Sequence, residues 1–563
     1  MRSTLSETEI LKSLLDNNYI SEEDTNKALA DYPRGTVIDN LIGARFFSKE
    51  IIGHSIAETF KVGYFNLQKS EIKEDTLNII PKDIVNENRV LAFKVDNYSI
   101  SVTTDRVEQI EEIKDLLETV IPKYKVEIFY SLTEDIDEIL LRFKDPFQDR
   151  INTIFESGTD FTNKFLDELF SEAYDLKASD IHFEPQSETV LLRIRVDGLL
   201  REVGEVPVQL YENILNRIKV MSNIRIDQRY RTQDGAIRFS NDKFAVDLRV
   251  SIVPVLDGQK IVIRILTNYT KNLNIRDLGF SEANFSKLEK AYKKPFGMIL
   301  TTGPTGSGKT TTLYSIIKIL LNPQINITTI EDPVEFRIPG INQIQVNAEN
   351  EITFARGLRS IVRQDPNVML VGEIRDVETA EIAVNAALTG HLLLSTFHAN
   401  DAATAIPRLV DMGIEPFLLA STLNLIVAQR LIRKICDSCK VSHEYTHDDL
   451  EELMPYSKEY FKDEKIRLYS GKGCQKCNFT GYRGRIGIFE LIEINDELQS
   501  LILTKSSSSE IWNVAKENGA ISFFEDGLDK VRAGLTTIEE VLRVAPAIEK
   551  KMIYKNLRKL NKK

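Results

Sequence analysis

The spacing of hydrophobic positions changes several times along the chain, and each change predicts a different kind of element. Over residues 1–65 the apolar positions follow a helical period, which predicts short amphipathic helices. Two similar segments there, YISEED and FFSKEI, leave open whether a helical unit is duplicated. From 66 to about 145, β-branched runs such as 98–103 alternate with a helical stretch at 107–120. We therefore expect an N-terminal domain over 1–145, with a helical unit followed by a small α/β part.

A charged segment separates this region from the next. Residues 142–160 contain Pro146 and little apolar periodicity, which favours a linker over 146–160. A helical pattern then begins at Phe161. The strand-like runs that follow lie at 190–196, 244–250 and 260–266. This alternation predicts a second N-terminal α/β domain over 161–275.

The rest of the chain alternates strands with longer helices. Its strand-like runs lie at 297–301, 325–330, 368–371 and 392–395. Alternation of this kind predicts a parallel sheet flanked by helices. Residues 276–563 are therefore expected to form one α/β domain, with a cysteine-bounded insertion at 436–485 and a helical tail.

Composition and charge restrict what such a protein can be. At 563 residues the chain is long enough for several domains. Its 72 Lys and Arg residues against 84 Asp and Glu residues give a net charge of −12, and such a surface repels the phosphates of nucleic acid. Polar residues interrupt the most apolar stretch, 417–432, so we expect no membrane-spanning helix. The first residues lack the pattern of a secretory signal, which predicts a cytoplasmic location.

The clearest chemical signal is a phosphate-binding loop. The sequence GPTGSGKT fits the pattern G-x-x-x-x-G-K-[ST] between an apolar run and a helical one. Glycines let backbone N–H groups surround a phosphate, the Lys309 side chain reaches its oxygens, and the Thr310 hydroxyl ligates Mg²⁺. The residues expected to hold the nucleotide are Gly303, Pro304, Thr305, Gly306, Ser307, Gly308, Lys309, Thr310 and Thr311. A glycine-rich turn that only caps a structural helix is the alternative.

Two acidic residues follow strand-like runs downstream of this loop. Glu335 ends the sequence TTIEDPVE, and Glu373 ends VMLVGE. A carboxylate presented at a strand end can face the γ-phosphate or join the Mg²⁺ shell, although Asp is more usual than Glu at the second position. Each acid taken alone is also compatible with a solvated strand end. Their place after a phosphate-binding loop favours function.

Histidine is rare here, with six in the chain, yet two flank one strand. His391 and His398 stand on either side of the run 392–395. They either sense the γ-phosphate or serve as packing and capping residues, and spacing alone leaves both interpretations open.

All four cysteines belong to two C-x-x-C pairs, Cys436 with Cys439 and Cys474 with Cys477. Two such pairs supply four thiolates for tetrahedral Zn²⁺, and a closed four-sulfur shell predicts a structural metal. Disulfides are the alternative, but they need an oxidising compartment. Redox chemistry is the remaining option.

Four motifs in one order carry a family resemblance: GPTGSGKTTTLYS, TTIEDPVEF, VGEIRDVETA and TGHLLLSTFHAND. This order resembles the secretion ATPase superfamily of type II secretion and type IV pili, and ASDIHFEP and DLRVS are also similar. The paired cysteines, GYRGRIGIFEL and the tail EDGLDKVRAGLTTIEEVLRV resemble its assembly branch. The resemblance is close over 161–545 and looser over 1–145. It implies a multidomain α/β protein with a RecA-like P-loop ATPase core, a smaller preceding α/β domain, a tetracysteine zinc insertion and a helical C-terminal tail.

The resemblance also implies catalytic roles. Glu335 would orient or deprotonate the attacking water, and Glu373 would support Mg²⁺. His391 and His398 would form a histidine box. ATP, Mg²⁺ and structural Zn²⁺ would be the cofactors.

Arginines of the preceding domain would reach the phosphates. Arg238 and Arg249 are the candidates, because guanidinium groups suit the charge that develops on the γ-phosphate. The family commonly has Arg where this chain has Ala236. Some members bind cyclic di-GMP through an N-terminal motif that begins Arg-Leu-Gly. This chain offers only Arg34-Gly35 there, so we expect no cyclic di-GMP binding.

The function implied is that of a homo-hexameric ATPase, peripheral at the inner face of the plasma membrane, that hydrolyses ATP to extend a type IV pilus. Its partners would be an inner-membrane platform protein and cytoplasmic pilus-machine components. A motor for type II secretion or a competence pseudopilus is the nearest alternative. A nucleic-acid translocase is disfavoured by the acidic charge, and a non-catalytic nucleotide-binding scaffold by the intact phosphoryl-transfer residues.

Overall fold

The computed structural model describes residues 7–17, 19–21, 49–67, 72, 74–140, 146–156, 158, 160–241, 244–266, 274–347, 350–450, 454 and 457–545. Most of the segment that would connect a duplicated helical unit, with Arg34-Gly35, lies outside these residues, so the duplication stays a prediction. The chain forms two compact units, Met1–Arg150 and Ile151–Lys563.

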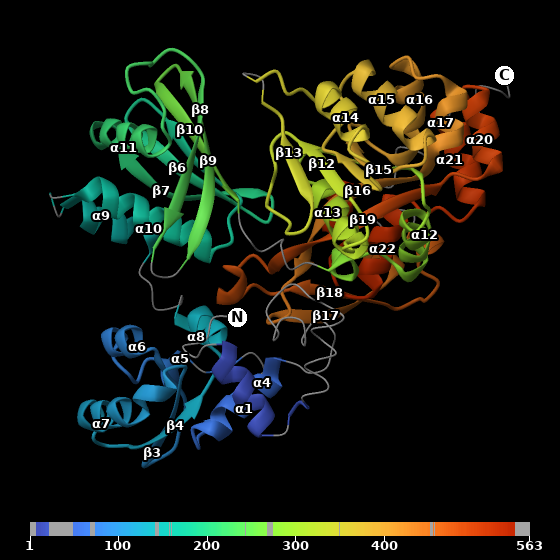
Figure 1. Cartoon of the computed structure of the whole chain (residues 1–563). Helices are drawn as coiled ribbons and strands as arrows, with labels where there is room; N and C mark the ends of the chain where they lie inside the picture. Colours follow the sequence, from blue (N-terminus) through green and yellow to red (C-terminus); the bar gives the residue numbers. More distant parts are fainter. Residues whose placement is uncertain are drawn as a thin grey trace. The chain divides into compact units, whose positions relative to one another are not determined.

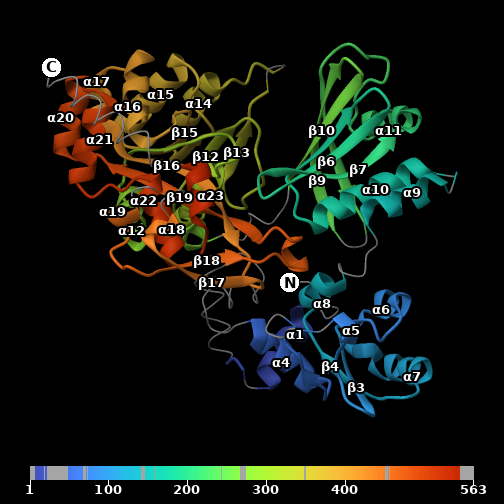
Figure 2. The same cartoon turned by 180° about the vertical axis from the view of Figure 1, so that it is seen from behind.

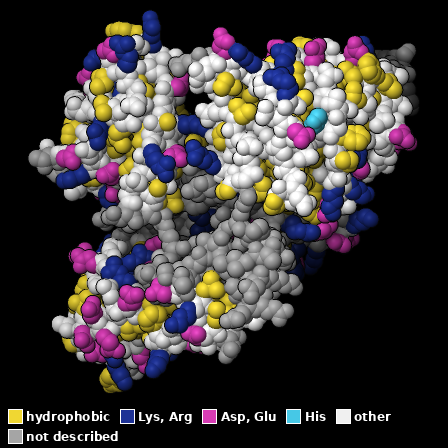
Figure 3. Space-filling view, viewed as in Figure 1, with side chains coloured by type: hydrophobic (Ala, Val, Ile, Leu, Met, Phe, Trp, Pro, Cys, Tyr) yellow, Lys and Arg dark blue, Asp and Glu magenta, His cyan; other side chains and the backbone are white. Residues whose placement is uncertain are grey.

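The first unit is a small α/β fold (Figure 1). Its helices are α1 (Glu7–Asp16), α4 (Lys49–Thr59), α5 (Glu74–Leu77), α6 (Lys82–Asn88), α7 (Ile110–Val120) and α8 (Thr133–Leu140). Its strands are β1 (Gly63–Tyr64), β2 (Val90–Val95), β3 (Ser99–Thr104) and β4 (Lys125–Tyr130), in the order β1-β4-β3-β2. Apolar residues of β3 and α7, among them Ile100, Val102 and Leu117, form its core. Acidic side chains gather over this unit at the lower left of Figure 3.

A helix that the sequence did not predict spans the division between the two units at residues 150 and 151. Helix α9 (Phe147–Glu156) occupies most of the segment expected to be a linker at 146–160. Phe147 and Ile151 are buried four residues apart, and the Phe155 ring lies 5.4 Å from that of Phe165. The expectation of an irregular linker was therefore wrong, because an apolar stripe of helical spacing is present among the charges.

A six-stranded antiparallel sheet follows, in the order β7-β6-β5-β10-β9-β8. Its strands are β5 (Asp180–Pro185), β6 (Thr189–Val196), β7 (Leu199–Pro207), β8 (Gln233–Ser240), β9 (Ala245–Val255) and β10 (Gly258–Leu266). Helices α10 (Phe161–Asp175) and α11 (Val208–Met221) pack on one face of this sheet (Figure 2). On that face the Phe183 ring contacts the rings of Phe165 and Tyr211. The opposite face carries polar residues at alternate positions, including Arg249.

The C-terminal part of this unit is built on a seven-stranded sheet in the order β13-β12-β14-β15-β11-β16-β19. The strands are β11 (Gly297–Thr302), β12 (Ile327–Glu331), β13 (Asn342–Gln345), β14 (Val368–Val371), β15 (Leu392–Phe397), β16 (Leu423–Ile435) and β19 (Tyr482–Glu493). All neighbours are parallel except β16 and β19. Met298 and Leu300 face one apolar core and Ile299 faces the other, so the parallel strands are buried on both sides as predicted.

Helices cover both faces of this sheet. They are α12 (Glu282–Tyr292), α13 (Lys309–Leu320), α14 (Phe354–Val362), α15 (Val377–Leu388), α16 (Ala402–Asp411), α17 (Pro416–Thr422), α20 (Asp496–Leu503), α21 (Ser508–Glu517), α22 (Phe523–Arg532) and α23 (Ile538–Val544). The insertion contains the antiparallel hairpin β17 (Lys440–Tyr445) and β18 (Ile466–Gly471), with the short helices α18 (His447–Leu450) and α19 (Ser457–Tyr460). No helix among the described residues is long and apolar enough to cross a membrane.

Candidate functional site

The phosphate-binding loop connects β11 to α13. Strand β11 ends at Thr302 and α13 begins at Lys309, so the loop leads from a buried strand directly into a helix. Gly306 and Gly308 have φ angles of +77° and +87°, which residues with a side chain rarely adopt. The first N–H groups of a helix lack acceptors within the helix, so this loop presents donors suited to an anion.

Two side chains add polar groups at the loop. Lys309 is only 9% exposed, and its Nζ donates hydrogen bonds to the carbonyl oxygens of Gly303 (2.8 Å) and Pro304 (3.1 Å). Burial lowers the pKa of Lys309, and the nearby Glu373 carboxylate opposes that shift. The Ser307 hydroxyl is buried and has no hydrogen-bond partner among the described residues. This donor set fits phosphate oxygens.

Glu373 is held beside the loop by two cationic or ionisable partners. It follows β14 by two residues, and its side chain is 14% exposed. One carboxylate oxygen lies 2.6 Å from Nη2 of Arg375, and the other lies 3.1 Å from Nε2 of His398, which directly follows β15. Because β14 and β15 are parallel neighbours, their carboxyl ends bring Glu373 and His398 together.

Glu335 lies in the segment after β12 and is met by an arginine of the six-stranded sheet. Nη2 of Arg249 donates to the carbonyl oxygen of Val334 at 3.0 Å, and its Nη1 lies 3.7 Å from a carboxylate oxygen of Glu335. Arg238 is exposed on β8, two residues from Ala236, which pairs with Arg249 in the register of the sheet. The structure thus brings one of the two candidate arginines to the acidic segment.

Sequence reasoning missed a buried carboxylate in the same segment. Glu331, at the end of β12, is 2% exposed and accepts hydrogen bonds from the hydroxyls of Tyr314 and Thr329. Burial raises the pKa of Glu331. The Tyr314 hydroxyl also accepts from the backbone N–H of Glu335 at 3.4 Å, so it links helix α13 to the acidic segment. The string TTIEDPVE contains both glutamates, and nothing in it tells which one is buried.

His391 is not at this site. Its Nδ1 lies 2.9 Å from the carbonyl oxygen of Ala386, near the end of α15, and its own carbonyl accepts from the N–H of Gly297 at the start of β11. His398 lies at the other end of β15. The expectation that both histidines form one box was therefore wrong in placement for His391, because six strand residues separate them. Its position matches the alternative capping interpretation.

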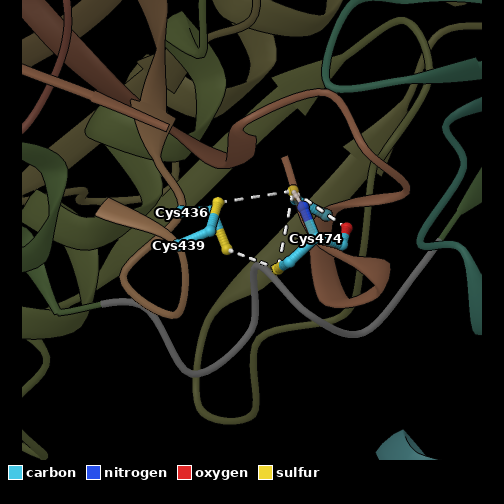
Figure 4. Close-up of side chains that lie close together, drawn as sticks. Cys436, Cys439 and Cys474 are labelled. Atoms are coloured by element: carbon cyan, nitrogen blue, oxygen red, sulfur yellow. Dashed lines mark hydrogen bonds between the residues drawn. The ribbon is translucent and has the colours of Figure 1, made fainter. Parts of the chain in front are cut away.

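The four cysteines converge (Figure 4). Their Sγ atoms all lie within 4.8 Å of one another. The Sγ distances are 3.9 Å for Cys436–Cys474, 3.8 Å for Cys439–Cys477 and 3.8 Å for Cys474–Cys477, and no disulfide joins them. Four sulfurs at about 2.3 Å from a tetrahedral Zn²⁺ lie about 3.8 Å apart, so these residues fit zinc.

The surroundings of the sulfurs differ. Burial raises the pKa of the Cys439 thiol to about 12. Burial has the same tendency at Cys477, but backbone N–H groups of Cys474 and Gly481 lower its pKa to about 7. N–H groups that point at a sulfur stabilise a thiolate, which is the form that binds a metal.

Comparison with known proteins agrees with this architecture. Residues 156–543 match the family described as Type II/IV secretion system protein, and residues 60–149 match the MshEN domain. The chain belongs to the type II/IV secretion system protein family. This membership confirms the predicted secretion ATPase superfamily and the predicted enzyme class, a P-loop ATPase.

Some proteins similar to this chain are named type IV pilus assembly ATPase and others type II secretion system protein E. The type IV pilus assembly ATPase PilB of Pseudomonas aeruginosa is 35% identical, over 97% of this chain and 100% of its own length. The type II secretion system protein E of the same organism is 47% identical, over 68% of this chain and 75% of its own. PilB of Thermus thermophilus is 42% identical over 74% of this chain, which spans only 47% of that longer protein.

A solved structure shares the fold of much of this chain. The ATPase DotB of Legionella pneumophila is 22% identical, with a TM-score of 0.51 over 69% of this chain and 97% of its own. With the parallel sheet, the phosphate-binding loop and the cysteine cluster, this confirms the predicted fold class.

Proposed function

We propose that this chain is the ATPase motor of a type IV pilus assembly machine, which hydrolyses ATP to power extension. The observation that carries the ATPase assignment is the convergence of Lys309, Glu373 and His398 at the carboxyl ends of parallel strands, where α/β proteins place their ligands.

The loop residues are assigned to nucleotide binding. Backbone N–H groups of the loop residues 305–311 would surround the β-phosphate, and Lys309 would exchange its bonds to loop carbonyls for phosphate oxygens. The Thr310 hydroxyl and the Glu373 carboxylate would hold the Mg²⁺ shell, the latter fixed in orientation by Arg375 and His398. Bound Mg²⁺ neutralises charge on the β and γ oxygens.

Glu335 is assigned to the attacking water. Its carboxylate is partly exposed, whereas Glu331 is buried and already accepts two hydroxyl hydrogen bonds, so Glu335 is the better placed acceptor for a water proton. Arg249 holds the segment through Val334 and pairs with Glu335. Arg249 would stabilise charge on the γ-phosphate when nucleotide binds, and Arg238, exposed on the neighbouring strand β8, stays the second candidate for this role.

The tetracysteine cluster is assigned a structural Zn²⁺. Four thiolates leave no open coordination position, so the metal would cross-link the ends of β16 and β19 rather than catalyse.

The share of this chain that aligns with each relative favours pilus extension over secretion. The P. aeruginosa pilus relative aligns with 97% of the chain, including the first unit, whereas the secretion relative aligns with 68%. A homo-hexamer acting on a platform protein at the inner face of the plasma membrane is part of this proposal. We also propose that this chain does not bind cyclic di-GMP.

The proposal is tested by phosphate release from Mg-ATP by zinc-loaded protein. Hydrolysis stimulated by the cytoplasmic domain of a pilus platform protein supports the motor, whereas stimulation by DNA points to a translocase. If the protein binds ATP but does not hydrolyse it, even with the platform domain present, it is a non-catalytic nucleotide-binding scaffold. Deletion of the gene in its source organism separates the pathways: loss of surface pili with normal protein secretion supports pilus extension, and the reverse contradicts it.

A further inference from the structure

The phosphate-binding loop rests on a side chain from a strand far away in sequence. The last register pair between β11 and β16 joins Thr302 to Ala428, so the next residue of β16, Gln429, lies where β11 turns into the loop. Gln429 is 2% exposed. It belongs to none of the motifs that carry the nucleotide chemistry.

Both ends of the Gln429 carboxamide are bonded to the loop and its helix. Nε2 donates to the carbonyl oxygen of Ser307 at 2.7 Å, and Oε1 accepts from the hydroxyl of Thr312 at 2.6 Å. The Ser307 carbonyl can only accept a hydrogen bond, which fixes the orientation of the amide. One side chain therefore joins the end of the loop to the first turn of α13.

Two glycines of the loop, Gly303 and Gly308, approach Gln429 too closely to carry a side chain. A Cβ atom on Gly303 would lie 2.3 Å from the backbone oxygen of Gln429, and one on Gly308 would lie 2.8 Å from its Nε2. These contacts are too short for real Cβ atoms. The glycines thus leave room for Gln429 as well as for phosphate.

We propose that Gln429 is a positioning residue of the phosphate-binding loop, which sets the curvature of the loop before nucleotide arrives. This inference rests on the proposed function. Gln429 acts through Ser307 and Thr312 and does not itself touch the reacting atoms. Because strand β16 is hydrogen-bonded to β11 on one side and β19 on the other, its backbone is a rigid support.

The chain contains a matched control at the other end of β11. Asn424, also on β16, donates from Nδ2 to the carbonyl oxygen of Phe296 at 2.8 Å and accepts from Nζ of Lys294 at 3.2 Å. It packs against Gly297, where a Cβ atom would lie 2.2 Å from its Nδ2. The two amides make the same kind of contacts, but only Gln429 makes them at the phosphate-binding loop.

The test compares Gln429→Met with Asn424→Leu, using equilibrium binding of a fluorescent ATP analogue and steady-state phosphate release. Gln429→Met should weaken nucleotide binding and raise KM roughly tenfold with kcat within about threefold of wild type, because it leaves a buried carbonyl at the loop without its donor. Asn424→Leu should lower the thermal midpoint but leave KM and kcat close to wild type. Equal nucleotide affinity in the two folded variants overturns the proposal.

Thr312 gives a second route if Gln429→Met does not fold. Thr312→Val removes the other bond to Gln429 without changing the size of the side chain, and Thr312→Ser keeps the hydroxyl. A larger KM for the valine variant than for the serine variant supports positioning, and equal values overturn it. If wild-type protein itself fails to bind the analogue, the proposed function fails; if wild type binds and the variants match it, only the role of Gln429 fails.

Discussion

The two ends of the parallel strands β11 and β15 carry similar residue types in different surroundings. At the amino ends, His391 bonds to the carbonyl of Ala386, and Asn424 bonds to backbone and a lysine. At the carboxyl ends, His398 contacts the Glu373 carboxylate close to Lys309. Similar side chains thus make structural contacts at the amino ends of the strands and lie at the candidate nucleotide site at the carboxyl ends. Residue type alone does not assign function; position on the sheet does.

The largest effect should follow from removing the loop lysine. Lys309→Ala takes away the cation expected at the β and γ oxygens, so phosphate release should fall by up to about a thousandfold. The control is Lys294→Ala, at the amino end of β11, which should cost stability through Asn424 but leave turnover near wild type. Equal losses of turnover in both variants would contradict the assignment of nucleotide binding to the carboxyl ends of the strands.

The two histidines at opposite ends of β15 should differ in their effect on turnover. His398→Ala frees one oxygen of Glu373, and loss of such a supporting partner costs about tenfold in turnover. His391→Ala removes a hydrogen bond to Ala386 and should lower the free energy of unfolding by about 1 kcal/mol with turnover unchanged. Turnover assays and denaturant titrations of both variants check this. A turnover defect in His391→Ala would return it to the catalytic site.

The smallest effect on the chemistry should come from the cysteine cluster. Chelation of zinc should lower the thermal midpoint by roughly 5–10 °C, because a structural metal contributes its binding energy to folding. Metal analysis should find one zinc per chain, and Cys477→Ser should lose it. ATP turnover measured below the midpoint should change less than in Lys309→Ala. If protein without zinc has the same thermal midpoint as zinc-loaded protein, the metal has no structural role.

Local motifs predicted the parts of the site that are contiguous in sequence. The loop 303–308 and the paired cysteines fix their geometry within a few residues of one another, so spacing was sufficient. Gln429 was not predicted, because strand pairing brings it to Thr312 from 117 residues away. Arg249, which lies 85 residues from Val334 in the sequence, was a candidate through the family resemblance and not through local spacing. His391 was assigned to the site by the family resemblance, whereas the strand between His391 and His398 places the two side chains at opposite edges of the sheet.

The strands and helices were predicted where apolar period and length agreed, as at β14 and α10. The prediction of a linker at 146–160 was wrong because the apolar stripe of this helix is short and lies among many charged residues. The stripe consists of Phe147, Ile151 and Phe155. The buried Glu331 shows a further limit, since its burial depends on Tyr314 of another element. Which carboxylate is buried is a tertiary property.

We expect Glu335 to activate the water that hydrolyses ATP at the carboxyl ends of the parallel strands, and Glu335→Gln tests this role. Steady-state phosphate release and binding of a fluorescent ATP analogue are measured side by side with wild type, on zinc-loaded protein with Mg²⁺. The account predicts that the variant binds the analogue as wild type does but releases phosphate about a hundredfold more slowly, because an amide cannot accept the water proton. Equal turnover in the variant and wild type would contradict it and move the catalytic role to another carboxylate.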